Sequence, residues 1–293
     1  KKIQELIKSI KPKKRIYIAF DGVAPIAKLQ QQKTRRYKSM YINKILDNLG
    51  QENSNKWDKT AITPGTDFMA KLGIKITKKF SKNKKIIVST TEEDGEGEHK
   101  IFNFIRTNPE KHQTETTIIY GLDADLIMLC LNNMHICPNI YIYRETPEFI
   151  KSLDNNFEPN ILYCMDINEF SKAIVNEMGG NKNSNNSVIS DYIFICFFLG
   201  NDFMPHFPSL NIRTNGINLL MTAYHNTMSF QKKNLIDNGE ICWKNLKEMI
   251  KWLADNEEAN LLKEYYIRRK WGNKFYNNSS KEDILKKIDN IPT

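Results

Sequence analysis

The stretch Thr117-Ile-Ile-Tyr-Gly-Leu-Asp-Ala-Asp-Leu126 joins a short, β-branched apolar run to two aspartates. A run of this composition that ends at a glycine is typical of a buried strand. Three further runs share that character: Ile16-Tyr-Ile-Ala-Phe20, Lys85-Ile-Ile-Val-Ser89 and Ile140-Tyr-Ile-Tyr143. Because helical stretches separate these runs, the sequence predicts an α/β domain with a mostly parallel sheet flanked by helices.

The helices are predicted from their periodicity and their start signals. A basic helix covers about Ala27 to Leu49, a second starts at Thr63-Pro64 with proline in its first turn, and a third covers about Glu96 to Thr107. A fourth, Ile167 to Met178, ends at a pair of glycines.

The chain is predicted to divide into two parts. The alternating strands and helices continue to an apolar helical segment, Asp191 to Gly200, and a turn with two prolines. From Trp243 onward the sequence is charged and helical. We therefore expect one domain over residues 1–226 and an α-helical C-terminal part over residues 227–293.

The composition is that of an ordinary globular protein, with 293 residues of which 40% are hydrophobic and 26% charged. Lysine and arginine number 43 against 34 acidic residues, and the formal charge of +9 favours a polyanionic partner, above all nucleic acid. The five cysteines form no C-x-x-C pair, which indicates neither a disulfide framework nor a zinc site and favours an intracellular compartment, cytoplasm or nucleus. The longest strongly apolar run, Tyr192 to Leu199, is too short to span a bilayer, so no membrane partner is expected.

Acidic residues follow several of the apolar elements. Asp123 and Asp125 come directly after a predicted strand, and in extended backbone their spacing of two places both side chains on one face. The carboxyl end of a parallel strand is also where α/β sheets bind ligands. Both carboxylates could therefore bind one divalent metal ion.

The other acids belong to three separate segments. Glu96 and Glu98 alternate with glycines, Asp21 ends a predicted strand, and Asp202 follows a buried run. A single aspartate at a strand end is often only a turn former or a helix cap. If the acids converge, however, their mutual repulsion requires bound cations. Two Mg²⁺ ions about 4 Å apart would suit phosphodiester hydrolysis.

A basic helix face follows Asp21 by a few residues. Lys28, Gln32, Arg35 and Arg36 lie at i, i+4, i+7 and i+8, so they share one face and can converge on an anion, whereas Lys33 and Lys38 are expected to point elsewhere. A charged helix is often only a solvated face. Here the acids that would make i,i+4 pairs are absent, and two adjacent arginines can clamp a phosphate. The sharper hypothesis is therefore a site for a terminal phosphate.

Five motifs, in this order and spacing, resemble the XRN family of 5′→3′ exoribonucleases. They extend over roughly residues 1–224 and are Ile16-Tyr-Ile-Ala-Phe-Asp-Gly-Val-Ala-Pro25 with Ala27-Lys-Leu-Gln-Gln-Gln32, Ile62-Thr-Pro-Gly-Thr66, Gly95-Glu-Gly-Glu-His-Lys100, Tyr120-Gly-Leu-Asp-Ala-Asp-Leu126 and Phe198-Leu-Gly-Asn-Asp-Phe-Met-Pro-His-Phe-Pro-Ser-Leu210.

The resemblance implies a PIN/flap-nuclease-like domain that removes mononucleotides from single-stranded RNA with a 5′-monophosphate. It implies two Mg²⁺ or Mn²⁺ ions, held at the positions that match Asp21, Glu96, Glu98, Asp123, Asp125 and Asp202. It also implies a 5′-phosphate pocket at the positions that match Lys28, Gln32, Arg35 and Arg36. The family has a further upstream segment and a second conserved block downstream, and we expect both to lie outside this sequence.

Two other functions remain open at this stage. One is a non-catalytic RNA-binding or scaffolding relative, which the presence of all six acids disfavours. The other is a structure-specific flap endonuclease on DNA, which would share the acids but not the basic motif and the Leu199 to Leu210 motif. The string Pro12-Lys-Lys-Arg15 resembles a nuclear-localisation signal, but it directly precedes a predicted strand, so a strand-preceding loop is the better interpretation.

Overall fold

The computed structural model describes residues 2–48, 57, 59–146, 156–158, 160–179, 185–201 and 204–276. The chain forms two compact units, residues 1–107 and residues 108–292. Each unit combines helices with small sheets, so the α/β prediction is confirmed at this level. Among the described helices, none has both the length and the apolar character that crossing a membrane requires.

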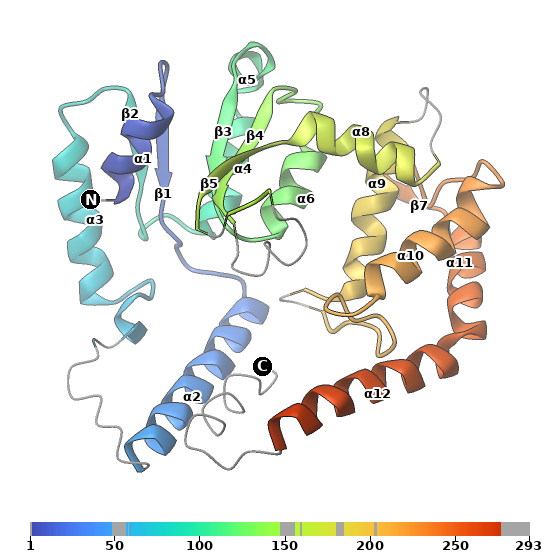
Figure 1. The fold of residues 1–293 in the computed structure, drawn as a ribbon. Coiled ribbons are helices and arrows are strands. Elements are labelled where there is room, and N and C mark those ends of the chain that lie inside the picture. The colour runs from blue at the N-terminus through green and yellow to red at the C-terminus, as the bar shows by residue number, and fades with distance from the viewer. Residues whose placement is uncertain are drawn as a thin grey trace. The chain divides into compact units, whose positions relative to one another are not determined.

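The first unit is built around two parallel strands (Figure 1). Its elements are α1 (Lys2–Ile10), β1 (Ile16–Ala19), α2 (Ile26–Asn48), the 3₁₀ turn η1 (Lys59–Ala61), α3 (Asp67–Phe80), β2 (Ile86–Ser89) and α4 (Gly97–Arg106). The register runs from Ile16 beside Ile86 to Ala19 beside Ser89. Because the strands are parallel, the residues that follow both of them, Asp21 and Glu96 included, emerge at the same edge.

The start of α3 differs from the prediction. The helix begins at Asp67 rather than at Pro64, because Gly65 has a left-handed φ of 84° that breaks any helix there. Thr66 caps the helix, since its hydroxyl accepts a hydrogen bond from the amide of Met69 at 3.4 Å. Thr63 and Pro64 therefore belong to a turn whose side chains are available to α2.

The second unit contains a three-stranded sheet and most of the helices. Its elements are α5 (Pro109–Thr114), β3 (Thr117–Tyr120), α6 (Asp125–Asn132), β4 (Ile140–Glu145), β5 (Leu162–Asp166), α8 (Ile167–Glu177), α9 (Asn185–Cys196), the 3₁₀ turn η2 (Phe197–Leu199), α10 (Gly216–Tyr224), the π-helical turn η3 (His225–Ser229), β6 (Ile236–Asp237), β7 (Glu240–Ile241), α11 (Trp243–Asp255) and α12 (Glu257–Tyr276).

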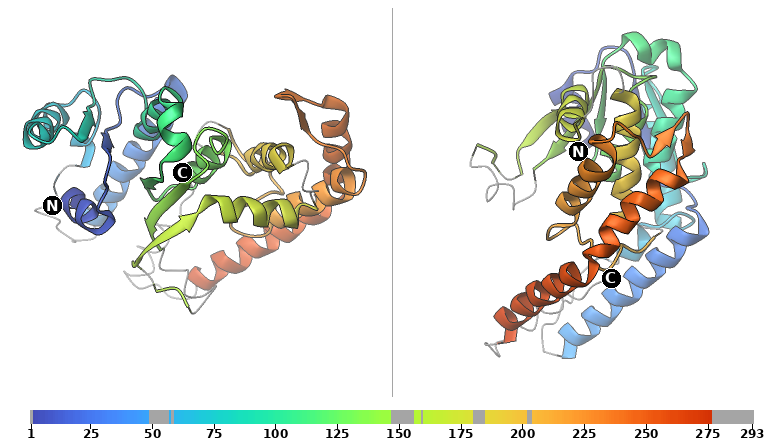
Figure 2. Two further views of the ribbon diagram at one scale, coloured as in Figure 1. Left: turned by 90° about the horizontal axis from the view of Figure 1, so that it is seen from above. Right: turned by 90° about the vertical axis from the view of Figure 1, so that its right-hand side faces the viewer.

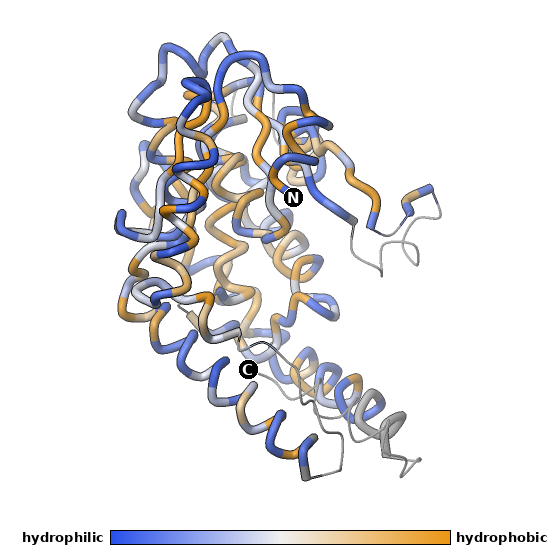
Figure 3. The backbone as a smooth tube through the Cα atoms, turned by 90° about the vertical axis from the view of Figure 1, so that its left-hand side faces the viewer, coloured by the Kyte–Doolittle hydropathy of each residue, from blue (hydrophilic) through white to orange (hydrophobic). Residues whose placement is uncertain are grey.

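The sheet of the second unit is mixed. Strands β3 and β4 are parallel, as expected, whereas β5, which the sequence analysis did not predict, pairs antiparallel with β4. Helices α6 and α8 pack against β4, and α9 packs in turn against α6 and α8 (Figure 2). The fully buried side chains there include Ile140, Ile142, Ile167 and Ile195. In Figure 3 the hydrophobic residues gather in the strands and inner helices, whereas α2 is hydrophilic over much of its length.

The C-terminal region is mainly helical but also contains a small hairpin. Strands β6 and β7 are joined by Asn238 and Gly239, whose φ values of 50° and 83° both lie in the left-handed region. Asparagine followed by glycine is the pair that favours such a two-residue turn. The sequence predicts an α-helical region here, and the structure adds this hairpin to it.

Candidate active site

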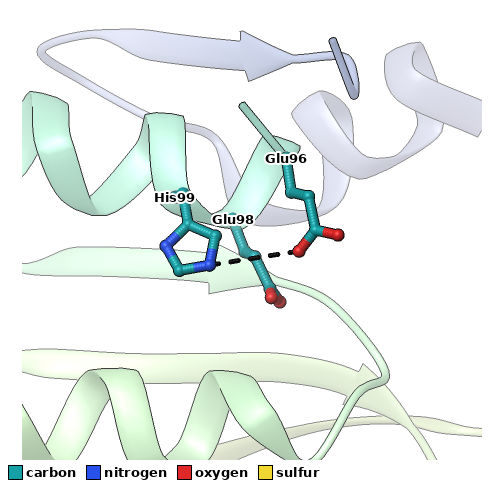
Figure 4. A group of neighbouring side chains, drawn as sticks. All are labelled: Glu96, Glu98 and His99. Atoms are coloured by element: carbon teal, nitrogen blue, oxygen red, sulfur yellow. Dashed lines mark ion pairs between the residues drawn. The ribbon is translucent and has the colours of Figure 1, made fainter. Parts of the chain in front are cut away.

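Three acidic or imidazole side chains meet at the start of α4. Glu96 is the N-cap residue of the helix, with extended φ and ψ of −70° and 151°, and Glu98 and His99 belong to its first turn. One ligand atom from each of the three lies within 4.8 Å of the others. Figure 4 shows these three side chains at the start of the helix. Glu96 is buried, Glu98 is half-buried and His99 is exposed. The cluster therefore offers two carboxylates and an imidazole to a cation from a surface that solvent reaches.

Asp21 is held beside this cluster by the backbone of α4. Its Oδ1 atom accepts a hydrogen bond from the amide of Gly97 at 2.6 Å. A Cβ atom at Gly97 would stand 3.1 Å from that oxygen and 3.3 Å from the carbonyl oxygen of Ala19. The glycine between Glu96 and Glu98 thus permits the close approach of β1 and α4 that brings the third carboxylate to the site.

The loops that follow β1 and β2 are also joined directly. The amide of Gly22 donates to the carbonyl of Gly95 at 2.8 Å, and the amide of Gly95 donates to the carbonyl of Val23 at 3.0 Å. Gly95 has a left-handed φ of 95°, and a Cβ at Gly22 would lie only 1.8 Å from the carbonyl oxygen of Glu93. Both glycines are therefore required by the way these two loops meet.

Lys100 is a structural residue of the site that the sequence analysis missed. Its buried ammonium donates to the carbonyl of Phe20 at 2.9 Å and to that of Thr90 at 2.7 Å, so it ties the ends of β1 and β2 together. Burial lowers the pKa of this ammonium, and the carboxylates of Glu93, Asp21 and Asp94 oppose that shift. The only signal in the sequence was its place at the end of the Gly95–Lys100 motif.

The basic helix approaches the acids through one ion pair. The Nζ atom of Lys28 lies 3.3 Å from Oε1 of Glu96. That carboxylate oxygen is buried, and among the described residues it accepts no hydrogen bond of acceptable geometry. A buried oxygen with unused acceptor capacity, close to other carboxylates, fits a hard divalent cation. The residues of this unit are therefore suited to such an ion.

A cavity of about 480 Å³ lies between α2 and the Thr63-Pro64 turn. The polar side chains that line it include those of Gln32, Lys33 and Arg36. Arg36 is fixed there, because its Nη2 atom donates to the hydroxyl of Thr63 at 2.9 Å. Apolar and aromatic side chains complete the wall, among them Val23, Leu29, Tyr37 and Met40.

The predicted phosphate-binding face is divided by this geometry. Gln32 and Arg36 line the cavity, and Lys28 reaches Glu96 instead. Arg35 is exposed and is not among the described residues of the cavity wall. The expectation that Lys33 points elsewhere is wrong, because Lys33 also lines the cavity. It lies three residues before Arg36, on the same side of the helix.

The remaining predicted acids lie elsewhere in the chain. Asp123 and Asp125 are exposed residues of the second unit, and Asp125 is the first residue of α6. Ala124 between them is helical, with φ and ψ of −68° and −28°, so the argument that extended backbone puts both side chains on one face is wrong here. Asp202 lies outside the described residues.

Comparison with known families gives two matches. The family model described as XRN 5′-3′ exonuclease N-terminus matches residues 1–146, and the one described as Xrn1 helical domain matches residues 182–290. The chain belongs to the XRN 5′-3′ exonuclease family. The resemblance of the five motifs to the XRN family is thereby confirmed.

Curated relatives agree with this XRN assignment. The chain is 31% identical to 5′-3′ exoribonuclease 2 of Candida glabrata, over 97% of this chain and 33% of the relative. It is 35% identical to 5′-3′ exoribonuclease 1 of Saccharomyces cerevisiae, over 97% of this chain and 20% of the relative. It is 30% identical to 5′-3′ exoribonuclease 2 of Arabidopsis thaliana, over 93% of this chain and 33% of the relative. The XRN chain thus spans about a third or less of the length of these relatives.

Proposed function

We propose that this chain forms the nuclease region of a divalent-metal-dependent 5′→3′ exoribonuclease. Its substrate would be single-stranded RNA with a 5′-monophosphate, and its products would be mononucleotides. The observation that carries this proposal is the Lys28–Glu96 ion pair, because it links the basic helix to the carboxylate cluster within one compact unit. The names of the relatives, which are 5′-3′ exoribonucleases, support the same activity.

In this proposal, carboxylates hold two Mg²⁺ or Mn²⁺ ions. Asp21, Glu96 and Glu98 would be ligands from the first unit, and Asp123, Asp125 and Asp202 would be ligands from the rest of the chain. The buried Oε1 atom of Glu96 and the oxygen-rich donor set support a hard cation. When bound, such ions activate a water molecule and stabilise the leaving oxygen of a phosphodiester.

The side chains of α2 would bind the 5′ end of the RNA. Gln32 and Arg36 would hydrogen-bond the terminal phosphate, and the Thr63 hydroxyl would keep the Arg36 guanidinium in position. The Lys28 ammonium would be shared, because an entering phosphate competes for it with the Glu96 carboxylate. Arg35, the fourth predicted residue, would contribute from outside the described cavity wall.

The domain division also remains a proposal. Residues 1–226 would form the PIN-like nuclease domain with a mostly parallel sheet, and residues 227–293 would form the helical extension. An RNA-binding relative without catalysis would keep the basic surface but would need no convergent carboxylates. A flap-type DNA endonuclease would need the carboxylates but no pocket for a terminal phosphate.

The test compares three RNAs that differ only at the 5′ end, which carries a monophosphate, a triphosphate or a hydroxyl group. We expect Mg²⁺-dependent release of mononucleotides from the monophosphate RNA, and much slower release from the other two. Equal rates on all three RNAs would contradict the terminal-phosphate pocket. Binding of RNA without turnover in Mg²⁺ or Mn²⁺ would favour the non-catalytic relative, and cleavage of branched DNA alone would favour the flap endonuclease.

A further inference from the structure

A second basic surface lies in the first unit, at the opposite end of β1 and β2 from the carboxylates. The strands are parallel, so the α1–β1 and α3–β2 connections enter at one end and the acidic loops leave at the other (Figure 1). Eight exposed lysines belong to these two connections and to the end of α3: Lys11, Lys13, Lys14, Lys78, Lys79, Lys82, Lys84 and Lys85. We call this set the strand-entry surface.

Hydrogen bonds bring the two connections together. The amide of Ile16 donates to the carbonyl of Lys85 at 2.8 Å, and the ammonium of Lys85 donates to the carbonyl of Lys13 at 3.0 Å. The ammonium of Lys79 lies 3.3 Å from Oε1 of Gln4 in α1. Segments that are about 70 residues apart in the sequence therefore present their lysines from adjacent positions.

The charge of this surface is not balanced locally. Neither residues 6–20 nor residues 68–91 contain an aspartate or a glutamate. Within the described part of the chain, none of the eight lysines forms an ion pair with a carboxylate. An ordinary solvated surface interleaves charges of both signs, whereas a run of one sign is the electrostatic footprint of a polyanion-binding face.

We propose that the strand-entry surface binds the phosphate backbone of RNA at a distance from the 5′ end. This inference rests on the proposed function, since it assigns a second contact to the same substrate. The two ends of β1 are separated by about 16 Å from Ile16 to Asp21, at about 3.3 Å for each extended residue. A dinucleotide held at the terminal-phosphate pocket is too short to reach both places, whereas a longer RNA can, so the surface strengthens the binding of longer substrates.

Two other partners fit this surface less well. An import receptor would need to bind Lys11 to Arg15 as an extended peptide, but the Nε atom of Arg15 is buried and the amide of Ile16 already donates to the carbonyl of Lys85. An anionic membrane would favour aromatic side chains beside the lysines. Along residues 69–91 the exposed large hydrophobic residues are aliphatic, Ile74 and Ile87, and the exposed Phe68 lies in the first turn of α3, at the other end of that helix from Lys78 and Lys79. A backbone that carries one phosphate per nucleotide needs only the spaced ammonium groups.

The test removes four charges from one stretch of the surface. The variant Lys78→Gln/Lys79→Gln/Lys82→Gln/Lys84→Gln changes exposed side chains only, and the matched control removes four exposed lysines from the second unit, Lys244, Lys247, Lys251 and Lys263. Affinity is measured by fluorescence anisotropy in EDTA against salt, with single-stranded RNAs of about 30 and about two nucleotides. Circular dichroism checks that both variants fold.

We expect the surface variant to lose at least tenfold in affinity for the long RNA and to bind the short RNA normally. The slope of log K against log salt should fall by up to about 2.8, which is about 0.7 for each of four phosphate contacts. The control variant should change much less, and the four Lys→Arg substitutions should keep the affinity. An unchanged affinity and slope for the long RNA would overturn the proposal, as would an equal loss in the control.

Failure of the proposed function would look different. Wild-type protein that does not degrade monophosphorylated RNA, yet loses long-RNA affinity through this surface, would refute the nuclease and leave the surface intact. Vesicles with about 30% phosphatidylserine provide a further arm, because basic surfaces also bind anionic lipid. Loss of vesicle binding with unchanged RNA binding would overturn the assignment to RNA.

Discussion

The substitution Lys100→Met tests how the site is held together. Methionine keeps most of the apolar stem but removes the ammonium that donates to the carbonyls of Phe20 and Thr90 at 2.9 and 2.7 Å. A buried carbonyl left without a donor costs about 1–3 kcal/mol, so two of them cost about 2–6 kcal/mol. Burial also desolvates the ammonium, which is why the pKa of Lys100 is lowered. The substitution removes this desolvation cost and so offsets part of the loss. We expect a net loss of about 2–3 kcal/mol in the free energy of unfolding.

The assay is urea unfolding followed by circular dichroism, with Lys71→Met as a control at an exposed position of α3. Because Lys100 joins the loops that carry Asp21 and Glu96, we also expect weaker Mn²⁺ binding by the folded variant in calorimetry. A stability within about 0.5 kcal/mol of wild type, the usual range for a surface substitution, together with normal Mn²⁺ affinity, would refute this account of Lys100.

Three further predictions follow from particular contacts. Arg36→Ala should reduce the preference for a 5′-monophosphate over a 5′-hydroxyl by about tenfold in kcat/KM, because Arg36 lines the cavity. Arg35→Ala should reduce this preference less, and equal effects of the two substitutions would contradict the assignment. Gly97→Ala should weaken Mn²⁺ binding in calorimetry, because its Cβ would stand 3.1 Å from Oδ1 of Asp21, whereas Gly73→Ala, whose Cβ meets Thr90 at 3.4 Å, should not. Burial raises the pKa of Asp191 above its ordinary 3.8, so the stability that this carboxyl contributes is fully present below that value and is lost as pH rises through the raised pKa. As pH rises from 3.8 through the raised pKa, the urea midpoint of wild type should therefore fall relative to that of Asp191→Asn. A difference between the two midpoints that stays constant with pH would refute the claim.

Much of the fold could be predicted from the sequence because its strands are short, apolar and followed by clear breaks. The predicted runs at Ile16, Lys85, Thr117 and Ile140 correspond to β1 to β4. Strand β5, Leu162–Asp166, was missed because it is an edge strand without a buried position, so its pattern does not stand out. The hairpin of β6 and β7 was also missed, although its Asn238-Gly239 pair was a usable signal.

The candidate site was predicted less completely than the fold. The acids and the basic face could be found because charged residues beside apolar runs are visible in the sequence. Lys100 could not, since a lysine in a helix is ordinarily solvated and only the fold buries this one. The sequence predicts only that Asp191 begins a helical segment, but its carboxylate is fully buried and accepts hydrogen bonds from Tyr224 and from the amides of Leu235 and Ile236. Such partners lie more than 30 residues away, beyond the reach of local patterns.

The most direct test of the central proposal follows the course of RNA degradation in Mg²⁺ by wild type, Glu98→Gln and Glu92→Gln. Glu92 is an exposed glutamate of the loop that leads to Glu96, so it controls for the loss of one charge. The substrate is a monophosphorylated RNA labelled at its 3′ end. Wild type and Glu92→Gln should shorten it progressively from the 5′ end and release mononucleotides, and Glu98→Gln should be slower by about 10³-fold, if the lost ligand stabilises the transition state by about 4 kcal/mol. Internal fragments from the wild type, or near-normal turnover by Glu98→Gln, would contradict a 5′→3′ exonuclease whose metal ions are held by this cluster.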